Sequence, residues 1–182
     1  MANYFSSNFT LGILGGGQLG KMMLYETRKF DITTHVLDPS LEAPCRIACD
    51  HFTQGDLMDY DTVYTFGKKV DILTFEIEGV NIEALEALEK EGKKVYPSSK
   101  TLRNIQDKGV QKKFYDTHKI PTAPFSVFET IAKVKKAVAS GELKLPFVWK
   151  SCTGGYDGKG VQVIKNSQTL DVLPDCPCIT ED

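Results

Sequence analysis

The stretch LGILGGGQLG, residues 11–20, decides the fold of the first half of the chain. Leu11 to Leu14 predict a short buried strand, because apolar residues dominate a run too short for a helix. Gly15, Gly17 and Gly20 follow in the spacing G-x-G-x-x-G, and apolar residues then recur at helical intervals. A strand that passes through glycines into a helix is typical of a loop whose backbone N–H groups approach a phosphate.

Strand-like and helix-like segments alternate on the C-terminal side of this loop. Residues 33–38 and 71–75 are rich in apolar and β-branched side chains and predict two further strands. Asn81 is placed to cap a helix that ends at Gly92, and residues 94–96 predict a fourth strand. This alternation favours right-handed crossovers and a parallel sheet. We therefore expect a Rossmann-like α/β domain over residues 1–97.

The second half, residues 98–182, has a different pattern. A helix is expected over residues 102–118, followed by a proline-containing extended connector. Two β-rich segments, residues 146–151 and 161–165, come next and are joined by glycine-rich residues. So short a link favours an antiparallel hairpin. We expect this half to form a mixed α and β domain.

Composition excludes several classes of protein. The chain has 182 residues, 41% of them hydrophobic, and a net charge of -2. Nucleic-acid binders carry a basic surplus, so no nucleic-acid partner is expected. No apolar run approaches the roughly 20 residues that span a membrane. The N-terminus lacks a secretory signal and the five cysteines are an odd number, which predicts reduced thiols and a cytoplasmic protein. The histidines and cysteines form no metal-spaced set, and no metal site is expected within the chain.

The first glycine loop admits three interpretations. Gly15, Gly17 and Gly20, with Asp38 at the end of the next strand, satisfy the fingerprint of dinucleotide binding. An NAD-dependent oxidoreductase is therefore one hypothesis. The same turn can hold a single sugar phosphate, or can form a tight strand-to-helix turn without a ligand.

The second glycine loop, KSCTGGYDGKG at residues 150–160, is more informative. It has four glycines within seven residues, with Lys150 on the preceding strand and Lys159 inside the loop. Backbone N–H groups and two ammonium groups suit a triphosphate. The spacing is neither that of a Walker loop nor that of a protein kinase. The alternative is a plain hairpin with its turn at Asp157 and Gly158, which would not require the other glycines.

Four segments together resemble one family. GGQLGKM (residues 16–22), FEIEGV (75–80), IPTAPF (120–125) and TGGYDGKG (153–160) are similar to the N5-carboxyaminoimidazole ribonucleotide synthetases of the ATP-grasp superfamily. The resemblance covers nearly the whole chain. It implies a step of purine biosynthesis in which ATP and bicarbonate give carboxyphosphate. The 5-amino group of aminoimidazole ribonucleotide then captures the carboxyl group.

The resemblance also implies roles for individual residues. Lys108 and Lys150 would contact ATP, residues 155–161 would form a flap over its phosphates, and Glu181 would begin the hinge that holds adenine and ribose. The residues implied in ATP binding are Lys108, Lys150, Gly155, Tyr156, Asp157, Gly158, Lys159, Gly160, Val161 and Glu181. Tyr156, Asp157 and Lys159 would in addition be catalytic, where the flap meets the second substrate.

The same resemblance assigns the first glycine loop to the ribonucleotide. Gly17, Gln18 and Leu19 would hold the 5′-phosphate through backbone N–H groups, and Glu76 would meet the amino end. Asp38 would then be structural, and NAD becomes the alternative.

The family continues beyond residue 182, so the resemblance implies an N-terminal fragment. Ligands of Mg²⁺ would lie in the later part, and we expect this chain to lack the reaction and to bind ATP weakly or not at all. The full-length form would be a homodimer. A nucleotide-sensing module without turnover is a further alternative.

Overall fold

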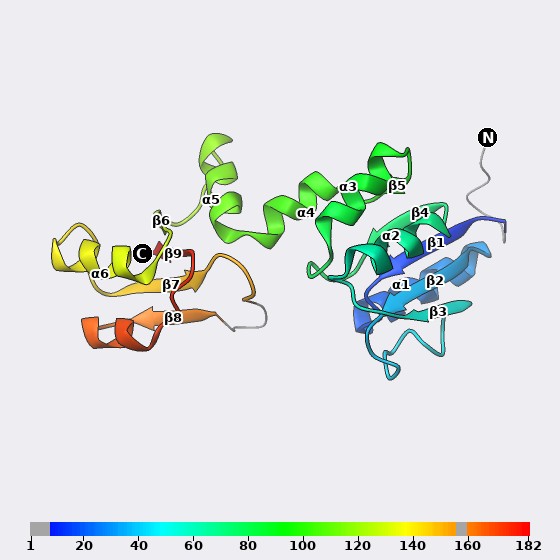
Figure 1. Ribbon diagram of the computed structural model, residues 1–182, viewed down its shortest axis with the longest axis horizontal. Coiled ribbons are helices and arrows are strands. Elements are labelled where there is room, and N and C mark those ends of the chain that lie inside the picture. Colours follow the sequence, from blue (N-terminus) through cyan, green and yellow to red (C-terminus); the bar gives the residue numbers. More distant parts are fainter. Residues whose placement is uncertain (1–7, 156–159) are drawn as a thin grey trace. The chain divides into compact units, whose positions relative to one another are not determined.

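The computed structural model describes residues 8–155 and 160–182, in two compact units that divide between Leu102 and Arg103. Each unit has its own sheet (Figure 1). Each also has its own hydrophobic core. The division lies within helix α4 (Ser99–Gln106), whereas the sequence-based boundary after residue 97 precedes that helix. Among the described residues, none of the helices combines the length and apolar character needed to cross a membrane.

The first unit is built on a five-stranded parallel sheet in the order β3-β2-β1-β4-β5 (Figure 1). Its strands are β1 (Thr10–Leu14), β2 (Thr33–Asp38), β3 (His51–Gln54), β4 (Ile72–Phe75) and β5 (Lys94–Val95). Its helices are α1 (Gln18–Thr27), the 3-10 helix η1 (Arg28–Phe30), α2 (Tyr60–Lys68) and α3 (Ile82–Lys90). The predicted parallel α/β architecture is confirmed, although α2 and β3 were not part of the sequence-based prediction.

Side chains of the central strands alternate between two cores. Leu14 of β1 packs in a cluster with Phe66 of α2 and Leu85 of α3. Its neighbour Ile13 belongs to a second cluster, which includes Leu24 of α1. Successive residues of a strand point to opposite faces, so both faces of the sheet are covered by helices.

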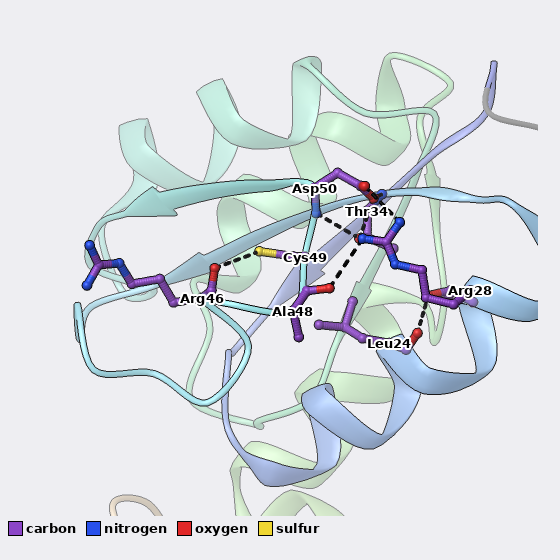
Figure 2. A network of polar contacts seen from close by, with 8 residues as sticks. Leu24, Arg28, Thr34, Arg46, Ala48, Cys49 and Asp50 are labelled. Atoms are coloured by element: carbon purple, nitrogen blue, oxygen red, sulfur yellow. Dashed lines mark hydrogen bonds and ion pairs between the residues drawn. The ribbon is translucent and has the colours of Figure 1, made fainter.

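A polar network ties the segment before β3 to the end of α1 (Figure 2). The carboxylate of Asp50 accepts hydrogen bonds from the backbone N–H and the hydroxyl of Thr34, at 2.7 and 2.9 Å. Its other oxygen lies 2.9 Å from the guanidinium of Arg28, which also contacts the carbonyl of Ala48. Burial alone would raise the pKa of Asp50, but these hydrogen bonds outweigh burial and lower it.

Replacement of Asp50 by asparagine is expected to destabilise the first unit by about 1 kcal/mol, because charge-assisted hydrogen bonds are lost. A carboxyl with a lowered folded-state pKa stabilises the fold above its ordinary pKa of 3.8 and loses that contribution as the pH falls. The Tm difference between wild type and Asp50→Asn, measured by calorimetry, should therefore be constant near neutrality and shrink in strong acid. A difference that stays the same in strong acid would contradict this account.

The second unit contains a four-stranded antiparallel sheet in the order β6-β9-β7-β8. Its strands are β6 (Phe125–Phe128), β7 (Phe147–Ser151), β8 (Val161–Ile164) and β9 (Cys178–Glu181). Its helical elements are α5 (Lys108–Thr117), α6 (Ile131–Ala139) and the 3-10 helix η2 (Ser167–Val172). The predicted hairpin of the two strands that flank the second glycine loop is confirmed.

The two faces of this sheet differ. Phe147 and Trp149 of β7 pack in a core with Val134 of α6 and Leu170 of η2. Lys150 follows Trp149 directly in the strand, and because successive side chains alternate, it belongs to the opposite face. That opposite face carries the second candidate site.

One predicted helix is broken in the structure. Residues 102–118 were expected to form a single helix, but α4 ends at Gln106 and α5 begins at Lys108. Asp107 has an extended backbone, and its side chain accepts a 2.9 Å hydrogen bond from the backbone N–H of Val110. An aspartate that caps a new helix explains the break.

Candidate functional site

The first glycine loop lies where the strand order of the sheet reverses. Strand β1 has β2 on one side and β4 on the other, and Leu14 is in register with Phe75. The residues that follow these two, Gly15 and Glu76, are therefore brought side by side. Ligands of open α/β sheets bind in this kind of crevice, beyond the carboxyl ends of the strands.

The glycines make room for the carboxylate of Glu76. A Cβ atom at Gly15 would lie 2.8 Å from Oε2 of Glu76, and one at Gly17 would lie 3.2 Å from Oε1. Gly15 also has a φ of +97°, which side chains other than glycine rarely adopt. Larger residues at either position would push the carboxylate away from the loop.

Helix α1 begins directly after these glycines. Gly17 is its N-cap residue and has no side chain to satisfy the first backbone N–H groups. Gln18 and Leu19 are exposed at this positive end of the helix, which favours an anion. The backbone N–H of Leu19 is hydrogen bonded to the carboxylate of Glu76. Of the residues expected to hold a phosphate, Gly17, Gln18 and Leu19 thus lie together, beside Glu76.

Glu76 is in an unfavourable place for a charged carboxylate. Partial burial raises its pKa, the nearby carboxylates of Asp38 and Glu78 raise it further, and the bond from Leu19 lowers it only in part. A carboxyl that is held against its own electrostatic preference is typical of a functional group.

Asp38 has a structural role. Its Oδ2 accepts a 2.7 Å hydrogen bond from the N–H of Gly16, and its Oδ1 accepts one of 2.8 Å from the N–H of Ser40. In the dinucleotide fingerprint this acid would hold the hydroxyls of a ribose. Because both oxygens are already bonded to backbone, the geometry does not favour the NAD-dependent oxidoreductase, and we do not retain that hypothesis.

The second candidate site is a group of charged side chains on the open face of the antiparallel sheet. Glu181 is 8% exposed, and its two carboxylate oxygens contact different ammonium groups. Oε1 forms an ion pair with Lys112 of α5, and Oε2 forms one with Lys150 of β7. These hydrogen bonds lower the pKa of Glu181, although burial on its own would raise it. The carboxylate of Glu181 therefore stays ionised, and its single negative charge is paired with two ammonium groups.

Lys108 connects α5 to the second glycine loop. Its ammonium donates a 3.0 Å hydrogen bond to the carbonyl of Gly155, and its backbone N–H donates to the carbonyl of Cys152. At the far end of the loop, the carbonyl of Gly160 accepts a 2.9 Å hydrogen bond from the N–H of Ser151. Gly160 has a φ of +69°, and a Cβ atom there would lie 2.3 Å from the Ser151 hydroxyl. This position requires glycine.

Exposed valines flank Lys150 on the same face. Residues directly opposite each other in antiparallel strands share one face, and Lys150 is opposite Val161 while Val148 is opposite Val163. Val161 and Val163 are 43% and 54% exposed. An apolar strip beside an ammonium group suits a nucleotide, whose base is apolar on its faces and whose phosphates are anionic.

The structure groups most of the predicted residues but not all of them. Lys108, Lys150, Gly155, Gly160, Val161 and Glu181 all belong to the second unit, and Gly17, Gln18, Leu19 and Glu76 to the first. Tyr156, Asp157, Gly158 and Lys159 lie outside the described residues. Lys112 was missed in the sequence. The available signal was its place four residues after Lys108, on one helix face.

Comparisons with known proteins identify the two domain families of the chain. Residues 9–106 match the ribonucleotide synthetase preATP-grasp domain, and residues 113–178 match the ATP-grasp domain. The N5-carboxyaminoimidazole ribonucleotide synthase of Bacillus subtilis (strain 168) is 34% identical over 175 residues, which is 94% of this chain and 45% of that protein.

Two solved structures are similar over nearly the whole chain. N5-carboxyaminoimidazole synthetase from Staphylococcus aureus complexed with ADP has a TM-score of 0.85 at 30% identity, covering 100% of this chain and 49% of that one. The synthase from Aspergillus clavatus in complex with ADP and 5-aminoimidazole ribonucleotide has a TM-score of 0.82 at 30% identity, covering 98% and 47%. This chain spans about half the length of the relatives that it matches.

Proposed function

The chain belongs to the N5-carboxyaminoimidazole ribonucleotide synthetase family of ATP-grasp proteins, and from this we propose that it serves the ATP-dependent carboxylation of aminoimidazole ribonucleotide by bicarbonate. The observation that carries the proposal is the arrangement on the open sheet face. There the ammonium of Lys150 lies beside exposed valines, with the second glycine loop at the end of its strand.

In the second unit, Lys150 and Lys108 would offset the negative charge of the ATP phosphates. Residues 155–161 would close over them and keep water from a reactive carboxyphosphate. Tyr156, Asp157 and Lys159 are proposed for the catalytic contacts between flap and second substrate. Glu181 would face the adenosine end of the nucleotide.

In the first unit, the backbone N–H groups of Gln18 and Leu19 would hold the 5′-phosphate of the ribonucleotide. Glu76 would leave Leu19 and accept a hydrogen bond from the 5-amino group of the substrate. An oriented amine close to carboxyphosphate makes the second transfer effectively unimolecular.

Mg²⁺ accompanies ATP in phosphoryl transfer, where it would offset charge on the phosphates. The described residues do not fit a Mg²⁺ site: both oxygens of Glu181 are engaged by lysines, and the described part of the chain holds no group of three metal-ligating side chains. A cytoplasmic location and a homodimer are further parts of the proposal, which rest on the family alone.

The proposal is tested by titrating the ¹⁵N-labelled chain with ATP and with aminoimidazole ribonucleotide. The initial slope of the amide chemical-shift changes against ligand concentration is inversely proportional to Kd. This slope can be measured even when binding is too weak to saturate. ATP should shift amides of β7 and of the second glycine loop, and the ribonucleotide should shift those of residues 15–20. NADH should show no fluorescence enhancement. A chain that gives no response to aminoimidazole ribonucleotide, or that binds NADH at residues 15–20, would contradict the proposal.

Replacement of Glu76 by glutamine separates stability from function. Burial and neighbouring carboxylates disfavour the charged form of Glu76 and raise its pKa in the folded protein. The folded protein therefore loses stability as the pH rises through this raised pKa. At neutral pH, Glu76→Gln should therefore have a Tm equal to or above that of wild type. Its response to aminoimidazole ribonucleotide should fall about tenfold, because a charge-assisted hydrogen bond is lost. A lower Tm of Glu76→Gln together with an unchanged response to aminoimidazole ribonucleotide would contradict this prediction.

A further inference from the structure

Lys112 is a buried lysine to which the proposed reaction assigns no role. It lies on α5, is 8% exposed, and is four residues from Lys108. Its ammonium contacts Oε1 of Glu181 and the hydroxyl of Thr122, and it lies 5.7 Å from the ring centroid of Phe125. An ammonium group is costly to bury unless it is paired, so these contacts hold Lys112 in one place.

The charges around Glu181 do not cancel. Lys112 and Lys150 each bind one oxygen of the same carboxylate, which leaves one positive charge in surplus. The Lys112 side chain is 10% exposed, whereas that of Lys150 is 28% exposed. The surplus therefore lies at the accessible end of the group, at Lys150, next to the second glycine loop.

We infer that Lys112 is a positioning residue for polyphosphate binding: it neutralises Glu181 and so leaves the charge of Lys150 to a polyphosphate ligand. Without Lys112, Glu181 and Lys150 would form a neutral pair, and a phosphate would have to compete with the carboxylate for the ammonium. The inference rests on the polyphosphate site proposed above. It adds that this site depends on a buried residue of α5 that does not contact the ligand.

Charge balance makes opposite predictions for the two partners. In Lys112→Met the Lys150 ammonium keeps the carboxylate of Glu181 but loses a positive neighbour, so its attraction for an anion should fall. In Glu181→Gln it loses a negative neighbour, so its attraction for an anion should rise. The double variant should return this attraction close to the wild-type value. Lys113→Met is the matched control, since Lys113 is exposed on the same helix.

Inorganic tripolyphosphate is the appropriate ligand, because it has no base or ribose and does not involve the proposed adenosine contact of Glu181. The slope of its amide shift changes should fall about tenfold in Lys112→Met, as one charge-assisted contact is weakened. It should exceed the wild-type slope in Glu181→Gln and return near it in the double variant. A role in packing alone predicts weaker binding in all three variants.

The outcomes separate the two proposals. The inference is overturned if wild type gives no response to tripolyphosphate, or if wild type responds while Lys112→Met has an unchanged slope. If the variants change the tripolyphosphate slope as expected but wild type gives no response to ATP, the inference stands and the proposed ATP site fails. Should Lys112→Met not fold, Glu181→Gln still decides: weaker tripolyphosphate binding than wild type would overturn the inference.

Discussion

Replacement of Lys150 by methionine is expected to reduce the response of this chain to ATP by about tenfold to a hundredfold. A hydrogen bond from an ammonium to a phosphate contributes about 1.5–3 kcal/mol, and the methionine has nearly the same length without the charge. In this variant Glu181 would keep its ion pair with Lys112, and these two side chains would form a neutral pair. The positive charge that attracts an anion at position 150 would be gone.

The measurement is the initial slope of amide shift changes against ATP concentration, which remains usable when binding is weak. Lys165→Met is the matched control, because Lys165 is an exposed lysine that follows β8 in the same unit. The response to aminoimidazole ribonucleotide should be unchanged in both variants, because that ligand is assigned to the first unit. A change below twofold for Lys150→Met would remove Lys150 from the ATP site.

Replacement of Trp149 by alanine is expected to have the largest effect on stability. Trp149 is 2% exposed and packs in the core of the second unit with Phe147 and Ile164. Truncation of a buried aromatic side chain costs about 3–5 kcal/mol, and small domains have total stabilities near the lower end of about 5–15 kcal/mol. The second unit should therefore lose most of its stability.

Trp149 is the only tryptophan of the chain, so its own fluorescence cannot follow the variant. Hydrogen exchange can, and the amides of β7, β8 and β9 should exchange faster by a factor of about a hundred to a few thousand. Trp149→Phe, which keeps an aromatic ring in the core, should have a smaller effect. Slow exchange of the β7 amides in Trp149→Ala would show that the core of this unit tolerates the cavity.

Much of the fold follows from local patterns. The glycine spacing after β1, the alternation of strands and helices, and the short glycine-rich link between β7 and β8 each act over a few residues. They predicted the parallel sheet and the hairpin. Patterns of this kind did not predict the break at Asp107, because an aspartate inside a helical run has the same periodicity whether or not it caps a new helix.

The two glycine loops, the lysine before the second loop and the class of each sheet could be predicted from residue patterns alone. Which side chains meet depends instead on the order of the strands: Glu76 comes beside Gly15 because β4 is the neighbour of β1. Glu181 comes between Lys112 and Lys150 because β9 lies between β6 and β7 and contacts α5. Turn residues and periodicity act between near neighbours in the chain, whereas strand order joins residues that are far apart in it, and no local pattern specifies that order.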